Sequence, residues 1–235
     1  MDEHRVQYLK DLGITAWVRR ERIHAKPATG ATDAPHLGVN GSRENGIAVM
    51  GWSELEQAVT GCTACGLRAG CTQTVFGVGA RQAEWMVIGE APGADEDRQG
   101  EPFVGRAGQL LNSMLAAIGL QRGQVYIANI LKCRPPGNRD PKPEEAALCR
   151  PFLQRQIALI RPKLILAVGR IAAQNLLNTD TPISRLRGRV HQLGGVPVVV
   201  TYHPAYLLRS PGEKRKAWTD LQFAIRTLNG GHQRL

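Results

Sequence analysis

The sequence predicts an α/β fold in which a parallel sheet is covered by helices on both faces. Two observations carry this prediction. Four runs have the length and apolar composition of buried strands: 85–89, 125–131, 164–169 and 197–202. Helical patterns alternate with these runs: 106–119, 143–160, 170–178 and 213–228. Strands that alternate with helices form a parallel sheet, and strands that are apolar throughout lie between two helical layers.

The elements follow one another in a simple order. The first run ends in a long loop over 89–108, rich in Gly, Pro and carboxylates, and a helical pattern follows that loop. The second run leads to the helix 143–160, whose Pro143, Glu144 and Glu145 are typical of a first helical turn. The third and fourth runs each precede one further helix. The chain shows no internal repeat.

The first fifty residues differ in composition from the rest. Residues 1–24 have mixed helical character and form a predicted N-terminal helical segment. Residues 25–50 are rich in Gly, Ala, Pro, Thr and Asn, which predicts a flexible linker. Ser53 is the predicted N-cap of a short helix that ends at Val59. We therefore expect the folded domain to span residues 51–235.

The chain is strongly basic. Lys and Arg number 30 against 20 Asp and Glu, a net charge of +10, and the pI is about 9.8. Such a charge favours an anionic partner, most often nucleic acid, although a generally basic surface is the alternative. No apolar run approaches the ~20 residues of a membrane span, and the N-terminus lacks the apolar core of a signal peptide. We expect a cytoplasmic protein without a membrane partner.

Three of the four predicted strands end in segments with unusual polar residues. GEAPG at 89–93 follows the first, Asn129 and the segment 132–136 end the second, and His203 follows the last. The carboxyl ends of parallel strands meet at one edge of a sheet, where ligands bind. We therefore expect a ligand site at this edge. Phe103, the one aromatic residue of the long loop, belongs either to this site or to the apolar core.

The five cysteines are unevenly spaced. Cys62 and Cys65 form a tight pair, whereas Cys133 and Cys149 stand apart and must be brought in by the fold. Zinc sites usually have two tight pairs, and iron–sulfur clusters accept more uneven spacing. A set of buried thiols is the third alternative, because disulfides are rare in the cytoplasm. Cys71 is expected to be an unligated thiol.

Taken together, these segments resemble the family 4 uracil-DNA glycosylases, the iron–sulfur branch of their superfamily. The resemblance covers residues 53–228, and Cys71 stands where the family typically has Arg. It implies a three-layer αβα fold with a four-stranded parallel sheet and the removal of uracil from DNA. It also implies a [4Fe-4S] cluster on Cys62, Cys65, Cys133 and Cys149. The motifs are CTAC at 62–65, GEAPG at 89–93, EPFVGRAGQLLN at 101–112, ANILKCRPPGNRDP at 128–141, Cys149, and YHPAYLLR at 202–209.

The resemblance also assigns residues to the uracil base. Phe103 matches the family's stacking position. Asn129 matches the residue that reads the base, and one amide supplies both an acceptor for N3–H and a donor to O4. His203 matches the donor that stabilises negative charge on the departing uracil, a contact worth on the order of 3 kcal/mol. Without the resemblance, an amide that caps a turn and a structural histidine are the ordinary alternatives.

Two carboxylates match further site positions of the family. We expect Glu90 to act on the attacking water or the sugar, because a carboxylate orients the water and stabilises positive charge. We expect Glu96 to contact the base edge and help exclude the methyl group of thymine. Asp95 and Asp97, on either side of Glu96, are expected to lie in a solvated acidic turn.

The segment after His203 is the predicted DNA wedge. Leu207, Leu208 and Arg209 offer an apolar tip and a cation, which base extrusion requires. The alternative is that the two leucines belong to the core face of the next helix. Basic residues at 214–216 suit phosphate contacts. The expected partner is uracil-containing DNA, single- or double-stranded, bound by a monomer associated with the nucleoid in DNA repair.

Two other functions compete with this interpretation. One is a nucleic-acid-binding module without catalysis, which the combination of Glu90, Asn129 and His203 argues against. The other is a nucleotide-binding protein that uses GEAPG as a phosphate loop. That alternative is weak, because no Gly-Lys-Ser/Thr follows and the loop is acidic.

Overall fold

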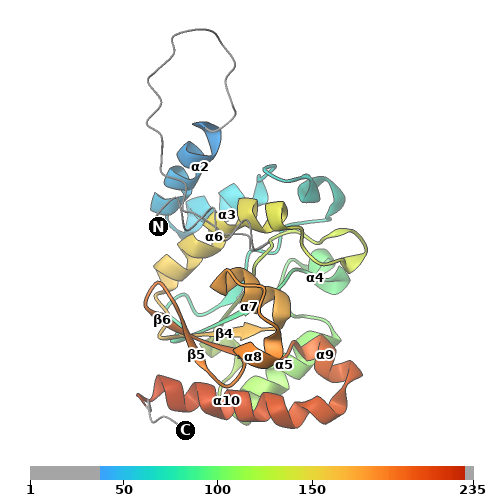
Figure 1. The fold of residues 1–235 in the computed structure, drawn as a ribbon. Coiled ribbons are helices and arrows are strands. Elements are labelled where there is room, and N and C mark those ends of the chain that lie inside the picture. The colour runs from blue at the N-terminus through green and yellow to red at the C-terminus, as the bar shows by residue number, and fades with distance from the viewer. Residues whose placement is uncertain (1–37, 231–235) are drawn as a thin grey trace, which may run out of the picture. The chain divides into compact units, whose positions relative to one another are not determined.

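The computed structural model describes residues 38–230, shown in colour in Figure 1. The predicted segment 1–24 and the first part of the predicted linker lie outside the described residues. The strands are β1 (Val78–Gly79), β2 (Trp85–Gly89), β3 (Tyr126–Asn129), β4 (Leu164–Val168), β5 (Val190–Leu193) and β6 (Val196–Thr201). The α-helices are α2 (Gly38–Val49), α3 (Trp52–Thr60), α4 (Ala94–Gln99), α5 (Arg106–Ala117), α6 (Pro143–Ile160), α7 (Arg170–Leu177), α8 (Ile183–Leu186), α9 (Pro204–Arg209) and α10 (Lys214–Leu228).

The strands form one six-stranded sheet in the order β1-β3-β2-β4-β6-β5. The four central strands are parallel, which confirms the predicted core of the sheet. The two edge strands, β1 and β5, are antiparallel and were not predicted. β5 and β6 form a hairpin that turns at Gly194 and Gly195, with φ of 56° and 84°. Two glycines with positive φ are a typical signal of a two-residue hairpin loop.

The sheet separates two apolar cores. Successive side chains of a strand point to opposite faces, so Met86 and Ile88 lie in one core and Trp85 and Val87 in the other. Helices α6 and α7 cover the first face, and α5 and α10 cover the second. Figure 1 shows α6 and α10 on opposite sides of the sheet. The predicted three-layer fold class is confirmed.

Residues 38–49 form helix α2, so the prediction of a flexible linker is wrong over this range. Ile47 is 3% exposed and packs with Phe152 of α6. The Arg43 guanidinium lies 4.9 Å from the Phe152 ring centroid, and its Nη1 donates to the Leu148 carbonyl at 3.0 Å. Contacts with a distant helix thus stabilise a segment whose own composition disfavours helix.

The boundaries of α5, α6, α7 and α10 lie close to those predicted, whereas the short helices α4, α8 and α9 were not predicted. Helix α6 has the predicted bounds. Helix α3 begins at Trp52, so Ser53 lies in its first turn and is not the N-cap. The Gly51 N–H donates to Glu54 Oε2 at 2.8 Å and closes this helix start. None of the helices over residues 38–230 is long and apolar enough to cross a membrane.

Candidate active site

The carboxyl ends of β2, β3 and β6 meet at one edge of the sheet, as predicted. Gly89 at the end of β2 pairs with Asn129 at the end of β3. A cavity of about 420 Å³ opens at this edge, a size typical of small-molecule sites. The five side chains predicted for catalysis or base binding all line it: Glu90, Glu96, Phe103, Asn129 and His203.

Asn129 brings a buried acceptor without a partner to this cavity. Its side chain is 2% exposed, and its Oδ1 accepts no hydrogen bond from any residue that the structure describes. A buried oxygen without a partner is costly, so a ligand N–H there would be favourable. Gly89 makes the necessary room, because a Cβ at position 89 would lie 2.5 Å from both Asn129 Oδ1 and Phe103 Cζ.

Phe103 has a backbone conformation that residues with side chains rarely adopt. Its φ is 56°, a strain of about 1–3 kcal/mol that surrounding contacts must offset. The Arg122 guanidinium donates to the carbonyl oxygens of Phe103 at 3.2 Å and Pro102 at 2.5 Å. Gly108 packs closely from the other side, since a Cβ there would lie 1.8 Å from the Phe103 carbonyl oxygen. Arg122, which the sequence did not single out, therefore fixes the loop that carries Phe103.

Replacing Arg122 with methionine is expected to lower kcat/KM for uracil release about tenfold, because a displaced ring positions the substrate poorly. Arg122→Lys keeps the charge but loses the two-carbonyl geometry, so we expect a similar loss. Steady-state kinetics on a uracil oligonucleotide measure both effects. Arg226→Met, an exposed position on α10, is the control. Wild-type kinetics in Arg122→Met would contradict this role.

The protonation of His203 follows from its contacts. Its Nδ1 accepts a hydrogen bond from the Ala205 N–H at 3.1 Å, at the start of α9. Burial, together with the Arg209 cation, lowers the pKa of His203 to about 4, and Glu96 opposes this shift. At neutral pH the ring is therefore neutral, with its hydrogen on Nε2. The ring centroid lies 5.6 Å from that of Phe103.

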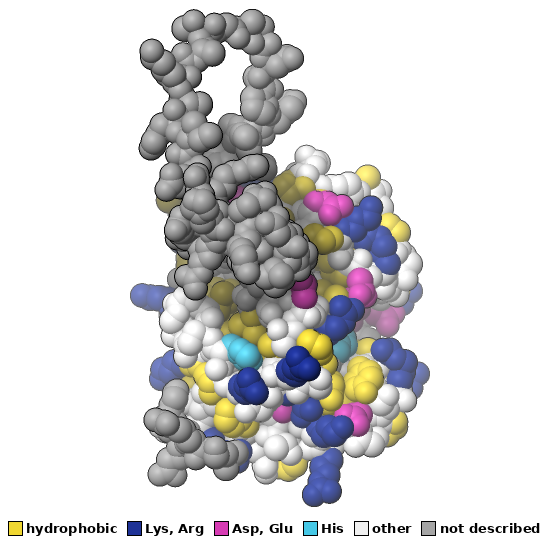
Figure 2. Space-filling view, in the orientation of Figure 1, with side chains coloured by type: hydrophobic (Ala, Val, Ile, Leu, Met, Phe, Trp, Pro, Cys, Tyr) yellow, Lys and Arg dark blue, Asp and Glu magenta, His cyan; other side chains and the backbone are white. Residues whose placement is uncertain are grey.

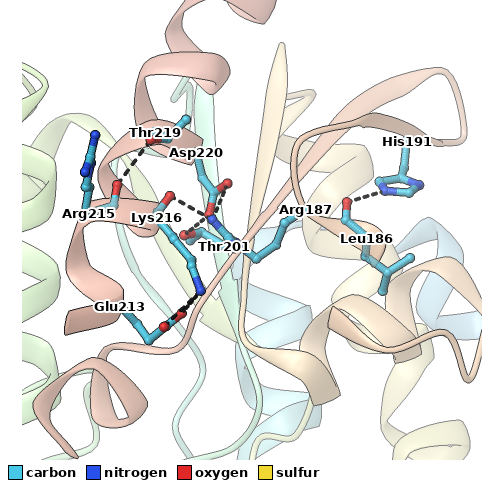
Figure 3. A network of polar contacts seen from close by, with 9 residues as sticks. All are labelled: Leu186, Arg187, His191, Thr201, Glu213, Arg215, Lys216, Thr219 and Asp220. Atoms are coloured by element: carbon cyan, nitrogen blue, oxygen red, sulfur yellow. Dashed lines mark hydrogen bonds and ion pairs between the residues drawn. The ribbon is translucent and has the colours of Figure 1, made fainter. Parts of the chain in front are cut away.

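A buried ion pair between Arg187 and Asp220, drawn in Figure 3, fixes Thr201 at the end of β6. Arg187 Nε and Nη2 donate to the two carboxylate oxygens of Asp220 at 2.6 and 3.0 Å. Thr201 Oγ1, the last side chain of β6, donates to Asp220 Oδ2 at 2.8 Å. The Arg187 guanidinium also lies 4.2 Å from the Tyr202 ring centroid. These contacts join the strand end to α10 and to the segment after α8.

Glu90 has a high pKa for a carboxyl group. Burial raises the pKa to about 7, the Asp140 carboxylate adds to this rise, and Arg170 opposes it. Asp140 and Arg170 pair with each other, with 2.7 Å between Oδ2 and Nη2. At neutral pH Glu90 is therefore divided between its acid and carboxylate forms. Such a group is suited to proton transfer.

Glu96 lines the cavity, and its carboxylate also holds the loop. Oε1 accepts hydrogen bonds from the N–H groups of Val104 at 3.0 Å and Gly105 at 3.1 Å. Oε2 accepts one from the N–H of Gly93 at 3.1 Å. The two arms of the loop around α4 are thus joined by one side chain. Contact between Glu96 and the base edge stays a prediction.

Asp97 is not in a solvated turn, so that prediction is wrong. Its side chain is 4% exposed. Its two oxygens accept hydrogen bonds from the N–H and Oγ1 of Thr72, each at 2.9 Å. Asp97 therefore connects the loop at the cavity to the segment that follows Cys71.

The predicted wedge is divided between core and surface. Leu207 is 1% exposed and packs in the core with residues of α5 and α10. It has no free surface to insert between bases, so this part of the prediction is wrong. Leu208 is partly buried, and Arg209 is exposed and lines the cavity. Tyr206 is 36% exposed at the cavity and packs on Tyr202, with ring centroids 5.1 Å apart.

Four of the five cysteines line a second, apolar cavity: Cys62, Cys65, Cys133 and Cys149. Over residues 38–230, no three His, Cys, Asp or Glu side chains are grouped closely enough to hold one metal ion. An iron–sulfur cluster binds each thiolate through a different iron, so it takes more widely spaced sulfurs than one ion does. Soft sulfur donors around an apolar cavity fit such a cluster.

Two residues near this cavity add detail that spacing did not provide. Arg43 of α2 donates from Nη2 to Cys62 Sγ at 3.7 Å. Cys71 is 8% exposed and does not belong to the described lining of the cavity. Its sulfur lies 3.8 Å from Nη1 of Arg68. Cys71 therefore lies outside the cavity lining, although its side chain is next to Cys133 in the same apolar core.

The fold and cavity define a class of enzyme. The family model of the uracil DNA glycosylase superfamily matches residues 76–222, a range that includes all five cavity residues named above. The chain belongs to this superfamily.

The type-4 relatives are similar over most of their length. The chain is 46% identical to the type-4 uracil-DNA glycosylase of Archaeoglobus fulgidus over 177 residues, which is 72% of this chain and 89% of the relative. It is 44% identical to that of Thermotoga maritima over 66% of this chain and 82% of the relative. It is 39% identical to that of Pyrobaculum aerophilum over 73% of this chain and 92% of the relative. Within the superfamily, the chain therefore belongs to the type-4 enzymes, which release uracil from DNA in DNA repair.

Proposed function

We propose that the cavity holds a uracil extruded from DNA and that Asn129 reads its polar edge. A stacked base cannot present its glycosidic bond to an enzyme, so it must leave the helix. Asn129 Oδ1 is buried without a hydrogen-bond partner among the described residues, and this observation supports the proposal most directly. Uracil N3–H would donate a hydrogen bond to this oxygen. The amide N–H would donate to O4. Cytosine presents the reverse pattern at N3 and C4, so the same amide rejects it.

His203 stabilises the leaving group in this proposal. Breaking the C1′–N1 bond leaves its electron pair on uracil, with negative charge mainly over O2 and N1. A fixed donor at this position stabilises that charge without reorganisation. The lowered pKa and the hydrogen bond to Nδ1 support a neutral ring that donates from Nε2. Phe103 supplies the stacking surface beside it.

Glu90 acts on the water in this proposal. The water oxygen forms a bond to C1′ as the uracil departs, and one proton of that water must be removed. A carboxylate with a pKa near 7 accepts this proton, and its negative charge stabilises the positive sugar. The departing uracil anion takes up a proton in turn, so the products are free uracil and an abasic site.

The pH dependence follows from this role. Because the carboxylate form is the active one, we expect kcat/KM to rise with pH through about 7, the pKa of Glu90. Glu90→Gln is expected to lower the rate and to abolish this rise. Single-turnover release of uracil from pH 5 to 9 measures both. Glu84→Gln, an exposed position, is the control, and a rise that persists in Glu90→Gln would contradict the assignment.

The DNA-binding face is proposed to surround the mouth of the cavity. Figure 2 shows Lys and Arg side chains over much of the face that carries α8 and α9. Leu208 and Arg209, with the exposed Tyr206 in place of the buried Leu207, form the proposed wedge. The net charge of +10 supports binding to the phosphate backbone. We propose that a monomer binds uracil-containing DNA, in single or double strands, at the nucleoid in the cytoplasm.

We propose that Cys62, Cys65, Cys133 and Cys149 hold a [4Fe-4S] cluster. When bound, such a cluster supplies a structural cross-link, since the hydrolysis transfers no electrons. The four cysteines join the segment after α3, the segment after β3 and helix α6. These segments support the loop with Arg134 and Arg139, which suits contacts with DNA.

Serine at Cys149 or Cys133 is expected to abolish iron binding, because the cluster loses one of four thiolates. Iron content and visible absorption of the purified protein measure this loss. Cys71→Ser is the matched control and should keep both signals, since Cys71 lies outside the described lining of the cavity. Loss of iron in Cys71→Ser, or full iron in Cys149→Ser, would contradict the ligand set.

A direct assay tests the proposal as a whole. Oligonucleotides with one uracil, paired or unpaired, should yield free uracil and an abasic site, and matched cytosine or thymine oligonucleotides should not. A protein that binds these oligonucleotides but releases no base would be a binding module instead.

A further inference from the structure

Lys132 is a buried cation to which the roles above assign no function. Its side chain is 2% exposed, although it ends in an ammonium group. A charged group removed from water is costly unless it is paired with an opposite charge. Lys132 therefore requires a partner.

The ammonium of Lys132 donates all three of its hydrogen bonds, but the acceptors are neutral and do not balance its positive charge. Nζ donates to Gln156 Oε1 at 2.7 Å and to the carbonyl oxygens of Asn129 at 3.1 Å and Phe76 at 3.2 Å. These three neutral acceptors use all three donors of the ammonium. Among the ion pairs of residues 38–230, none includes Lys132.

A compensating negative charge is available at the cysteine site, whose cavity Lys132 also lines. Lys132 lines the apolar cavity together with the four cysteines, and it precedes Cys133 in the chain. Four thiolates exceed the charge of the iron–sulfur core that they bind, so a loaded site is anionic. We propose that Lys132 is the charge partner of the four-cysteine site. The inference rests on the cluster proposed above.

This pairing connects the cysteine site to the base-reading end of β3. Lys132 lines the cavity of the four cysteines, and its ammonium donates to the main-chain carbonyl of Asn129. Gln156, which is fully buried, supports both groups by donating to the Phe76 carbonyl at 2.9 Å and to the Tyr126 hydroxyl at 3.3 Å. Lys132 is thus a positioning residue, and the cluster stabilises the cation that positions Asn129.

The reduction potential of the cluster reports this charge directly. A nearby cation favours the more negative, reduced state, so its removal shifts the potential to lower values. Arg43 also approaches the site, at Cys62 Sγ, but it is partly exposed and therefore screened by water. Its replacement should shift the potential less than replacement of Lys132.

The test compares cluster-loaded variants by redox titration followed with electron paramagnetic resonance. Lys132→Met removes the charge, and Lys132→Arg keeps it. Gln156→Glu leaves the lysine in place and adds a neighbouring negative charge. Lys142→Met, an exposed position at the start of α6, is the control. We expect lower potentials in Lys132→Met and Gln156→Glu, and wild-type potentials in Lys132→Arg and Lys142→Met.

Each outcome bears on the proposal. A lower iron content in folded Lys132→Met than in Lys132→Arg also supports the proposal, because only the second variant keeps the positive charge. If Lys132→Met does not fold, an unchanged potential in Gln156→Glu overturns the proposal. Equal potentials and iron contents in Lys132→Met and wild type overturn it as well. A wild-type protein without iron refutes the cluster itself and is recognised before any variant is compared.

Discussion

Replacing Asn129 with alanine is expected to lower the rate of uracil release by at least about 100-fold, the typical loss when a fixed hydrogen-bonding group is removed from a catalytic site. The variant keeps the cavity but loses the acceptor for N3–H and the donor for O4. Single-turnover release of uracil from an oligonucleotide measures the loss. The effect should be large because both hydrogen bonds to the base come from one side chain.

The same variant separates base reading from folding. Asn129 Oδ1 has no partner among the described residues, so its removal breaks no hydrogen bond at that atom. We therefore expect a melting temperature close to that of wild type, and affinity for DNA without uracil should also be retained. Asn175→Ala, on α7, is the control. A wild-type rate in Asn129→Ala would refute the assignment.

The parts of the fold that depend on local pattern could be predicted from the sequence. Central strands such as 85–89 and 164–168 are apolar throughout because helices cover both faces. Helix 143–160 begins at a proline followed by two glutamates. The edge strands β1 and β5 could not be predicted because they are short and only partly buried. Helix α2 could not be predicted because distant contacts of Arg43 and Ile47 stabilise it.

The site was predictable to the extent that it follows from strand ends. Glu90, Asn129 and His203 are placed by the parallel topology, so their convergence could be foreseen. The residues that hold them could not, because Arg122 and Lys132 act through carbonyl oxygens that carry no sequence signal. Leu207 was predicted to be functional but is structural. Its position in the sequence suited a wedge, but the register of the short helix α9 turns its side chain into the core.

The protonation states are also properties of the folded chain. No motif indicates that His203 is neutral, since this follows from burial, from Arg209 and from the Ala205 N–H. The pKa of Glu90 lies above that of a solvated carboxyl group, because burial is the largest contribution to its shift. His203 is thus suited to donate a hydrogen bond to the leaving group without carrying charge. Glu90 is suited to accept a proton from the water near pH 7.

Alanine at His203 is expected to lower the rate of uracil release by about 100-fold to 1,000-fold, because the departing uracil loses its fixed donor. Binding of DNA should be largely retained. His191→Ala is the matched control, since the His191 ring bonds the Leu186 carbonyl at 2.8 Å and lies outside the described lining of the active-site cavity. A control with wild-type kinetics beside an impaired His203→Ala would support the assignment.

The pH profile distinguishes a neutral donor from a cationic one. With a pKa of about 4, His203 keeps the same form from pH 5 upward, so it contributes no change in rate over that range. The rise through about pH 7 belongs to Glu90 and should persist in His203→Ala at the lower rate. If His203 acted as a cation, the wild-type rate would fall as rising pH removed its proton. That fall would be absent from His203→Ala. A profile of wild type that falls between pH 5 and 7, and becomes flat in His203→Ala, would refute the neutral form.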